Sequence, residues 1–190
     1  MSRTLLKNYT LAELEDWVES RGERRFRARQ LYRHLYARQA STWTQCSDLG
    51  KKFCEELESE THLDVMQLAG SDMAADGTVK YLFSLLDGHT IEAVYIPDHP
   101  RHTLCLSSQV GCALGCRFCL TGTLGFKRNL ETAEIVDQVC QVQRAMNPAR
   151  LTNLVLMGMG EPLANYDAVV RAMAILQDPN GLAFSHRRIT

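Results

Sequence analysis

The residues with the clearest chemical potential are three cysteines that crowd into a short stretch of the chain. Cys112, Cys116 and Cys119 stand in the string Cys-Ala-Leu-Gly-Cys-Arg-Phe-Cys. Thiolates are the usual ligands of iron–sulfur clusters, and cysteines spaced this closely on one loop can converge on a single cluster. Three protein ligands on a four-iron cluster leave one iron open to bind and reduce a second molecule. The spacing therefore predicts a [4Fe–4S] site with a vacant coordination position.

The same cysteines could instead bind zinc or be purely structural. Zinc favours four ligands, and Cys105 could supply the fourth thiolate. Zinc loops usually pair their cysteines in two short knuckles, which this spacing does not do. Buried structural cysteines are the second alternative, although three so close together are rarely coincidental. The remaining cysteines match no motif, and we expect them to be structural: Cys46, Cys54 and Cys140.

A second candidate is the glycine-bearing segment Gly158-Met-Gly-Glu-Pro162, which follows an apolar run. In parallel β/α folds, the loops at the carboxyl ends of strands build the functional site. Glycines allow backbone amides to approach a ligand, and Glu161 can pair with an ammonium group. A Gly-x-Gly pattern alone favours a simple tight turn, so a ligand-binding role for this segment depends on the residues around it.

Glu92 is the third candidate, because it lies in a β-rich run over residues 90–96. Strand alternation places Glu92 on the same side as Val94 and Ile96. A carboxylate among apolar neighbours is harder to ionise and is suited to proton transfer. An ordinary surface position is the alternative that the residues alone favour.

The elements that must position these residues change character along the chain. Residues 1–60 are predicted to be helical, with a capping box at Thr10 and Glu13 and two further helices over 26–39 and 47–59. Three strands are predicted next, over 63–68, 78–86 and 90–96. The last two are joined by Asp87-Gly88, a strong hairpin signal.

From about residue 103 the pattern alternates between strand and helix, which favours right-handed parallel β/α units. The apolar run 154–157 predicts a strand covered on both faces. We expect the chain to be part of a longer architecture, because the last parallel strand would lack an outer neighbour. The predicted order is a strand over 102–107, a helix over 131–146 ended by Asn147-Pro148, a strand over 154–157, a helix over 166–177 and a strand over 187–190.

Composition limits the function less than the motifs do. The formal net charge is -1, but seven arginines and one acidic residue lie between Arg21 and Arg38. Such a stretch is either a phosphate-contacting face or a solvated helix face. The chain has no run of eighteen apolar residues and no apolar signal-peptide core, so we expect a cytoplasmic protein.

The motifs together resemble a known family. The Cys-x3-Cys-x2-Cys spacing is that of the radical S-adenosylmethionine (SAM) superfamily, and the flanking strings Leu104–Cys112 and Thr121–Leu130 resemble the RlmN branch of the RlmN/Cfr family. The resemblance covers the whole chain. It implies an α/β fold with a helical, RNA-binding accessory domain (1–60), a small antiparallel β segment (61–100) and the first units of a partial β/α barrel (101–190).

The resemblance also implies roles for particular residues. Cys112, Cys116 and Cys119 would hold the [4Fe–4S] cluster, and Gly160 and Glu161 would hold the amino-acid end of SAM. Glu92 would be the general acid/base at the adenine. Cys105 would resolve a covalent enzyme–RNA intermediate by forming a disulfide with a C-terminal cysteine beyond Thr190, so these 190 residues are expected to be inactive alone.

The implied reaction is methylation of carbon 2 of an adenine in 23S ribosomal RNA, with transfer RNA as a second substrate in some members. This carbon offers no lone pair, so the hard chemistry is delegated to the cofactors. A monomer that takes electrons from a flavodoxin-type reductant is expected. Two alternatives stay open: methylation of carbon 8 of the same adenine, and a non-catalytic RNA-binding fragment.

Overall fold

The helical part of the molecule comes first in the chain. The computed structural model describes residues 3–146 and 149–190. Strands β1 (Thr4–Leu5) and β2 (Thr61–His62) pair in parallel and close this part around helices α1 (Leu11–Glu19), α2 (Phe26–Tyr32) and α3 (Lys51–Glu60). The predicted capping box is confirmed, because the Thr10 hydroxyl accepts from the Glu13 amide and the Glu13 carboxylate accepts from the Thr10 amide.

The second and third predicted helices are less regular than their patterns indicate. The α-helical bonding of α2 ends at Tyr32, and the chain continues as a π-helix over Arg33–Ala37. The third predicted helix divides at Gly50, whose φ of +84° separates a 3-10 turn (Ser47–Leu49) from α3. Hydrophobic periodicity does not distinguish these helix types, because they differ by only one residue in hydrogen-bond spacing.

A five-stranded sheet forms the second part of the molecule. Its strand order is β3-β4-β5-β6-β9; the first four strands are antiparallel, and β6 and β9 are parallel. The bounds are β3 (Met66–Met73), β4 (Val79–Leu85), β5 (Thr90–Asp98), β6 (Arg101–Cys105) and β9 (Asn153–Val155).

The antiparallel strands and the first parallel strands form one continuous sheet. The antiparallel β segment expected over residues 61–100 continues into β6, because β5 pairs with β6 from Val94↔Cys105 to Asp98↔Arg101. The chain turns between Asp98 and Arg101 and returns beside β5 as β6. The hairpin that carries Glu92 is therefore attached directly to the strand that carries Cys105.

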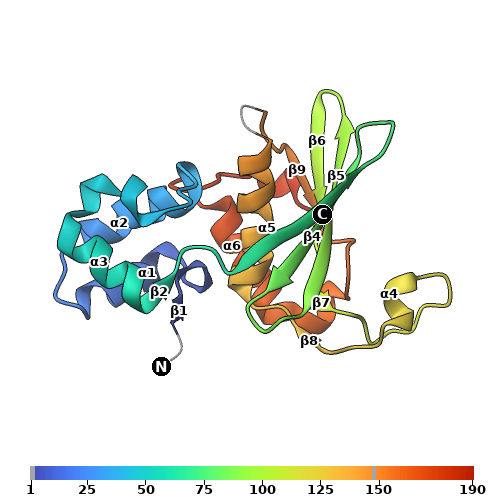
Figure 1. The fold of residues 1–190 in the computed structure, drawn as a ribbon, viewed down its shortest axis with the longest axis horizontal. Coiled ribbons are helices and arrows are strands. Elements are labelled where there is room, and N and C mark those ends of the chain that lie inside the picture. Colours follow the sequence, from blue (N-terminus) through green and yellow to red (C-terminus); the bar gives the residue numbers. More distant parts are fainter. Residues whose placement is uncertain (1–2, 147–148) are drawn as a thin grey trace.

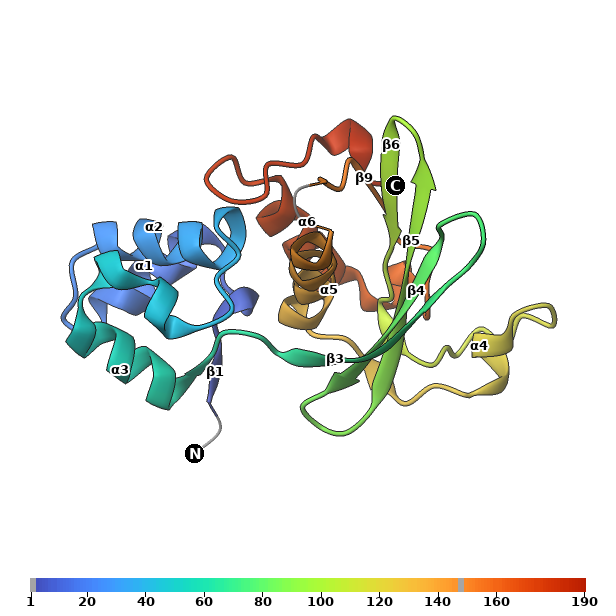
Figure 2. The ribbon, with the colours of Figure 1, turned by 45° about the horizontal axis from the view of Figure 1, so that its top comes forward.

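Helices α5 (Thr132–Ala145) and α6 (Tyr166–Gln177) cover one side of the sheet, and α5 lies between the sheet and the helical part (Figures 1 and 2). The β6–α5–β9 connection confirms the predicted parallel β/α unit. The last predicted strand is reduced to one parallel bridge between Ile189 and Leu154, after a 3-10 turn over His186–Arg188. The predicted helix end at Asn147-Pro148 lies outside the described residues.

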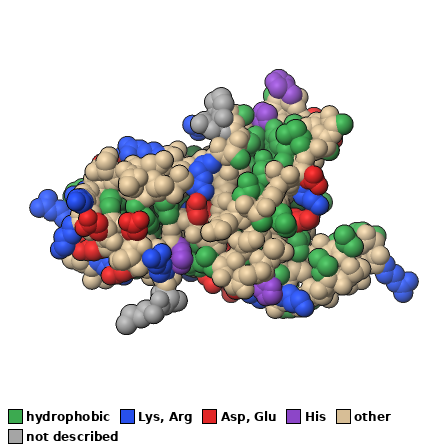
Figure 3. Space-filling model, viewed as in Figure 1, with side chains coloured by type: hydrophobic (Ala, Val, Ile, Leu, Met, Phe, Trp, Pro, Cys, Tyr) green, Lys and Arg blue, Asp and Glu red, His purple; other side chains and the backbone are tan. Residues whose placement is uncertain are grey.

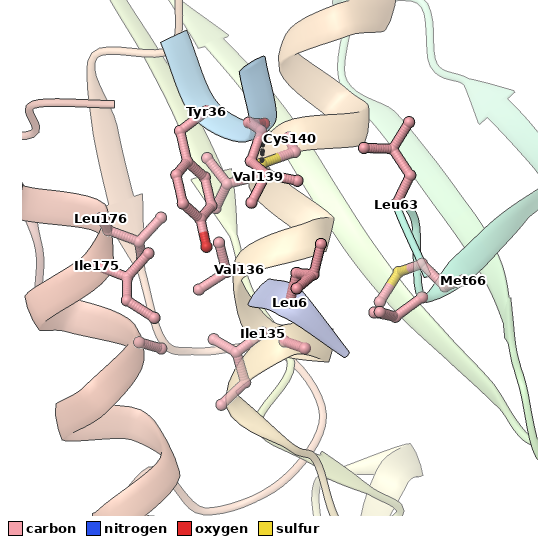
Figure 4. Close-up of a cluster of buried hydrophobic side chains, with 14 of the residues drawn as sticks. Leu6, Tyr36, Leu63, Met66, Ile135, Val136, Val139, Cys140, Ile175 and Leu176 are labelled. Carbon is pink, nitrogen blue, oxygen red and sulfur yellow. Dashed lines mark hydrogen bonds between the residues drawn. The ribbon is translucent and has the colours of Figure 1, made fainter. Parts of the chain in front are cut away.

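One hydrophobic core joins the two parts (Figure 4). Leu6 and Tyr36 of the helical part are fully buried against the apolar face of α5, on which Val136 and Val139 lie. Charged side chains gather on the surface of the helical part, whereas hydrophobic ones gather over the sheet (Figure 3). Within the described ranges, no helix is both long and apolar enough to cross a bilayer.

Candidate functional site

The three motif cysteines lie on a loop whose two ends are held together. Strands β7 (Gln109–Val110) and β8 (Arg128–Asn129) pair antiparallel, and residues 111–127 between them are called the cysteine loop here. The loop contains the short helix α4 (Leu120–Thr123) and projects on the side of the sheet away from α5 (Figures 1 and 2). The sheet thus separates the cysteines from the helical part.

Gly111 fixes the path of the cysteine loop where it leaves β7. Its φ is +74°, and a Cβ built at this position would lie 1.7 Å from the carbonyl oxygen of Gly125. No side chain can be tolerated there, because the two strands of the loop cross in backbone-to-backbone contact. The glycine therefore has a steric reason in addition to its conformational freedom.

The cysteine loop carries a donor set that fits an iron–sulfur cluster. Cys112, Cys116 and Cys119 are free and partly exposed. Backbone N–H groups of Gly122 and Thr121 donate to Cys119 and lower the pKa of its thiol, so the thiolate that ligates iron is favoured there. In residues 3–146 and 149–190, no three Cys, His, Asp or Glu side chains already converge as metal ligands. One segment thus supplies all three thiols, and the side chains would have to turn toward one point to hold a cluster.

The strand register places Glu92 and Cys105 on the same face of the sheet. Cys105 is opposite Val94, and Glu92 is two residues from Val94 on the same strand. Because side chains two apart share a face, all three point to one side. The residues on the other face, Ile91, Ala93 and Leu104, are buried under the helices. Glu92 and Cys105 therefore face away from α5, toward the side from which the cysteine loop projects.

Glu92 lies at the surface of the sheet, which is the position that its residue neighbours alone favour. Its carboxylate lies 3.2 Å from the Lys80 ammonium, and its side chain is 42% exposed. The other possibility, a carboxylate among apolar neighbours, does not describe this position, because alternation along β5 shows only the neighbours on the same strand. Lys80 comes from the adjacent strand β4, where it is opposite Val94. The two side chains form an ion pair between neighbouring strands.

A cavity of about 380 Å³ lies between the hairpin β4–β5 and the cysteine loop. Glu92 and Leu82 line it from the sheet, and Gly111 and Thr121 line it from the loop. The volume lies in the range of about 300–1,000 Å³ that is usual for small-molecule sites. The structure thus brings Glu92 and the cysteine loop to one cavity, which the sequence did not show.

Cys105 differs chemically from the loop cysteines. It ends β6, is buried and is free. Burial raises the pKa of its thiol, although the N–H of Met157 partly offsets this effect. Burial thus shifts Cys105 toward the thiol form, whereas backbone hydrogen bonds shift Cys119 toward the thiolate. Met157 itself is 78% exposed, so the strand predicted to be covered on both faces is open at its carboxyl end.

The turn over residues 158–161 is bound to the segment that leads into the cysteine loop. Ser108 and Gln109 both donate backbone N–H bonds to the Met159 carbonyl, at 2.8 and 3.2 Å. A Cβ at Gly158 would lie 2.6 Å from the Leu106 carbonyl oxygen. The Glu161 carboxylate accepts the Leu163 N–H at 3.0 Å and so caps the next turn. Glycines in this turn therefore serve close packing as well as any ligand.

The arginine-rich stretch is largely neutralised. Within the described residues, five of its seven arginines form ion pairs with carboxylates, and Arg24 and Arg33 do not. Glu15, which is 7% exposed, accepts hydrogen bonds from both Arg25 and Arg29. The phosphate-binding potential of this face is thus smaller than its sequence indicates.

Sequence reasoning missed Arg128, which binds the end of the cysteine loop to two other elements. Its guanidinium donates to Asp87 in the β4–β5 turn at 2.6 Å and to both carboxylate oxygens of Glu134 at 2.8 Å. The hydrogen bonds that Arg128 donates to Glu134 and Asp87 outweigh the opposing effect of burial and raise the pKa of Arg128. Asp87 lies 41 residues away along the chain, so no local pattern could have indicated the contact.

Comparison with known families divides the chain in two. Residues 4–63 match the ribosomal RNA large subunit methyltransferase N-terminal domain, and residues 106–190 match the radical SAM superfamily. The cysteine loop and the 158–161 turn lie in the second match. Helices α1, α2 and α3 lie in the first.

Individual relatives agree with these matches. The chain is 62% identical over 191 residues to the dual-specificity RNA methyltransferase RlmN of Syntrophobacter fumaroxidans, covering all of this chain and 56% of that protein. It is 45% identical over 183 residues to a probable enzyme of the same name from Aquifex aeolicus, covering 96% of this chain and 52% of that protein. The chain spans about half the length of these curated relatives.

A solved structure is similar over almost the whole chain. A radical SAM methyltransferase from Sphaerobacter thermophilus superposes with a TM-score of 0.94 at 39% identity, covering 98% of this chain and 55% of that one. This similarity confirms the α/β fold class that the sequence predicted.

Proposed function

Because this chain belongs to the RlmN family of the radical SAM superfamily, we propose that its protein methylates carbon 2 of an adenine in 23S ribosomal RNA. Transfer RNA is the second substrate, in line with the dual specificity in the names of its relatives. The observation that carries the proposal is the shared position of Glu92, Cys105 and the cysteine loop on one side of the sheet.

The cofactors of the family are a [4Fe–4S] cluster and SAM. Cys112, Cys116 and Cys119 hold the cluster, and Gly160 and Glu161 receive the amino-acid end of SAM. When bound, the two cofactors supply one-electron chemistry that can act at a carbon without a lone pair. Backbone hydrogen bonds join the 158–161 turn to Ser108 and Gln109, which lead into the cysteine loop, and this supports a site that uses both.

Glu92, which lines the cavity, and Cys105, which lies on the same face of the sheet, act on the substrate. Glu92, whose carboxylate lies 3.2 Å from the Lys80 ammonium, serves as the base that takes a proton from the adenine ring. Cys105 keeps its proton because burial raises its pKa, and it acts as a thiol in product release. The cavity volume of about 380 Å³ is sufficient for one unstacked base.

The remaining features concern partners. The helical part contacts RNA phosphates through the arginines that lack an ion pair in the described structure, Arg24 and Arg33. A flavodoxin-type reductant supplies electrons, and the protein is a cytoplasmic monomer. These partners stay predictions, as does the inactivity of residues 1–190 alone.

Anaerobic reconstitution tests the proposal most directly. Supplied with iron and sulfide, the protein is expected to turn brown and to show a cluster spectrum that changes when SAM is added. A colourless zinc protein, or a cluster spectrum that ignores SAM, would contradict the proposal. Mass-spectrometric mapping of 23S RNA treated with the full-length protein then separates carbon 2 from carbon 8. RNA binding that survives removal of the cluster, without methylation, would favour the non-catalytic alternative.

A further inference from the structure

We propose that Gln109 is a positioning residue that holds the turn carrying Glu161 in a fixed place relative to both ends of the cysteine loop. The inference rests on the proposed role of Glu161 in binding SAM. Gln109 begins β7, directly before the loop, and is 1% exposed. No motif of the sequence gave this residue a function.

The Gln109 carboxamide joins three elements through hydrogen bonds. Its Oε1 accepts the backbone N–H of Glu161 at 2.9 Å, and its Nε2 donates to Asn129 Oδ1 at 2.8 Å. Asn129 Nδ2 in turn donates to the carbonyl oxygen of Ala164 at 3.3 Å. The chain of hydrogen bonds therefore starts at Glu161, the last residue of the 158–161 turn, passes through β7 and β8, and ends three residues later at Ala164.

The groups at the two ends of this chain of hydrogen bonds fix which atom donates and which accepts in each bond. The Glu161 N–H can only donate, and the Ala164 carbonyl can only accept. Each amide between them therefore has one orientation that satisfies all its partners. Gln109 and Asn129 are also register partners in the β7–β8 ladder. They are the outer pair of the short ladder that closes the cysteine loop, so the bonds clamp the turn onto the base of that loop.

Gly160 provides independent support for this arrangement. Its φ is +102°, and a Cβ at this position would lie 2.5 Å from Cβ and 2.7 Å from Cγ of Gln109. Real Cβ atoms do not approach other atoms so closely, so only glycine allows Gln109 to lie against the turn. Gly160 is therefore explained by the packing of Gln109.

A fixed turn matters because one ligand must meet two groups at once. SAM bound at Glu161 has to reach the cluster on the cysteine loop, and binding to a site assembled from separate segments depends on their prior alignment. Truncating Gln109 leaves the Glu161 N–H and the Asn129 carboxamide without these partners. The turn then becomes mobile relative to the loop, whereas the cysteines themselves are unchanged.

Gln109→Ala and Asn129→Ala test the clamp, and Gln109→Glu tests its first bond. The matched control is Gln143→Ala, since Gln143 also bridges two backbone groups, donating to the Ala149 carbonyl at 2.7 Å and accepting from the Leu151 N–H at 2.8 Å. Three quantities are measured on the reconstituted protein: iron per chain, the dissociation constant of SAM from its effect on the cluster spectrum, and hydrogen exchange of the Glu161 amide.

Gln109→Ala is expected to retain its iron, to bind SAM about tenfold more weakly and to exchange the Glu161 amide at least tenfold faster. Gln109→Glu keeps an acceptor for that amide, so exchange returns toward the original rate. Asn129→Ala is expected to weaken SAM binding and speed Glu161 exchange by smaller factors. Gln143→Ala is expected to change neither the SAM dissociation constant nor the exchange rate.

Two results would contradict the inference, and they differ in what they overturn. If the Glu161 amide exchanged at an unchanged rate in both Gln109→Ala and Asn129→Ala, the proposed clamp would be refuted. If exchange became faster but the affinity for SAM did not change, the clamp would be supported. The proposed role of Glu161 in binding SAM would then be refuted. If Gln109→Ala fails to fold, Gln109→Glu and Asn129→Ala decide the matter.

Discussion

The connection between the two parts of the molecule and the cysteine loop are built in opposite ways. The connection contains an ionic seam, defined as Lys7, Asp64, Asp137 and Arg144. In this seam the Lys7 side chain is 1% exposed and that of Asp137 is 0% exposed. In the cysteine loop, Phe118 is 93% exposed and the neighbouring thiols are free.

The seam is stable because every charge in it has a partner. Lys7 pairs with Asp137 and, at 2.9 Å, with Asp64, which also binds Arg144. Asp137 accepts the Val65 N–H at 2.9 Å as well. Burial alone would lower the pKa of Lys7, but the carboxylates outweigh it and raise the pKa. A group held in one charge state this firmly is suited to structure and not to proton transfer.

The loop has the reverse character. Its apolar side chains are not packed, and its position depends on the β7–β8 pair, on Arg128 and on the turn at 158–161. The comparison shows that stability and reactivity lie in different parts of this chain.

Replacing Lys7 with Met should destabilise the protein most. The change leaves Asp137 buried without its cation, which costs about 3–5 kcal/mol in comparable buried pairs. The free energy of unfolding from urea titration measures the effect. Lys51→Met is the control, because Lys51 is 90% exposed and its pair with Glu55 is 3.8 Å long. Equal stability of the two variants would show that the seam contributes little.

Gly111→Ala should remove the cluster without unfolding the protein. Its Cβ would clash with Gly125, so the loop must change its path. We expect at least a tenfold loss of iron uptake, measured colorimetrically, with a nearly unchanged urea midpoint. Gly115→Ala has a positive φ of +60° but no atom within 4 Å of the added carbon, and it should lose less iron. A Gly111→Ala protein with full iron content would refute the steric argument.

Thiol labelling should separate the cysteines by pH. The pKa of Cys119 is lowered by backbone N–H groups, and burial raises that of Cys140 to about 12. Because the thiolate reacts, iodoacetamide should modify Cys119 first as the pH rises, and should leave Cys140 unmodified below pH 9 in the folded apoprotein. Peptide mapping by mass spectrometry reads the order. Early labelling of Cys140 would mean that the core opens more readily than the seam suggests.

Arg29→Ala should have the smallest effect. Arg29 is 64% exposed, and Glu15 keeps its pair with Arg25 when Arg29 is removed, so the loss should stay below about 1 kcal/mol, as for exposed pairs. A shift in the urea midpoint close to the measurement error is expected. A loss of unfolding free energy comparable to that of Lys7→Met would show that this surface pair also stabilises the fold.

Local spacing determined much of this protein from the sequence alone. The three loop cysteines, the capping box at Thr10, the hairpin turn at Asp87-Gly88 and helices α5 and α6 all depend on residues a few positions apart. Such patterns are visible in a sequence because hydrogen-bond and side-chain periods are short. The cofactor class followed from the first of them.

Only the tertiary structure decided how these local pieces meet. Lys7 and Asp137 are 130 residues apart, and Gln109 and Glu161 are 52 apart. The common face of Glu92 and Cys105 depends on a strand register, and a shift of one residue would reverse it. Local propensity carries no information on such pairings, because they are selected by burial and hydrogen bonding of the whole chain.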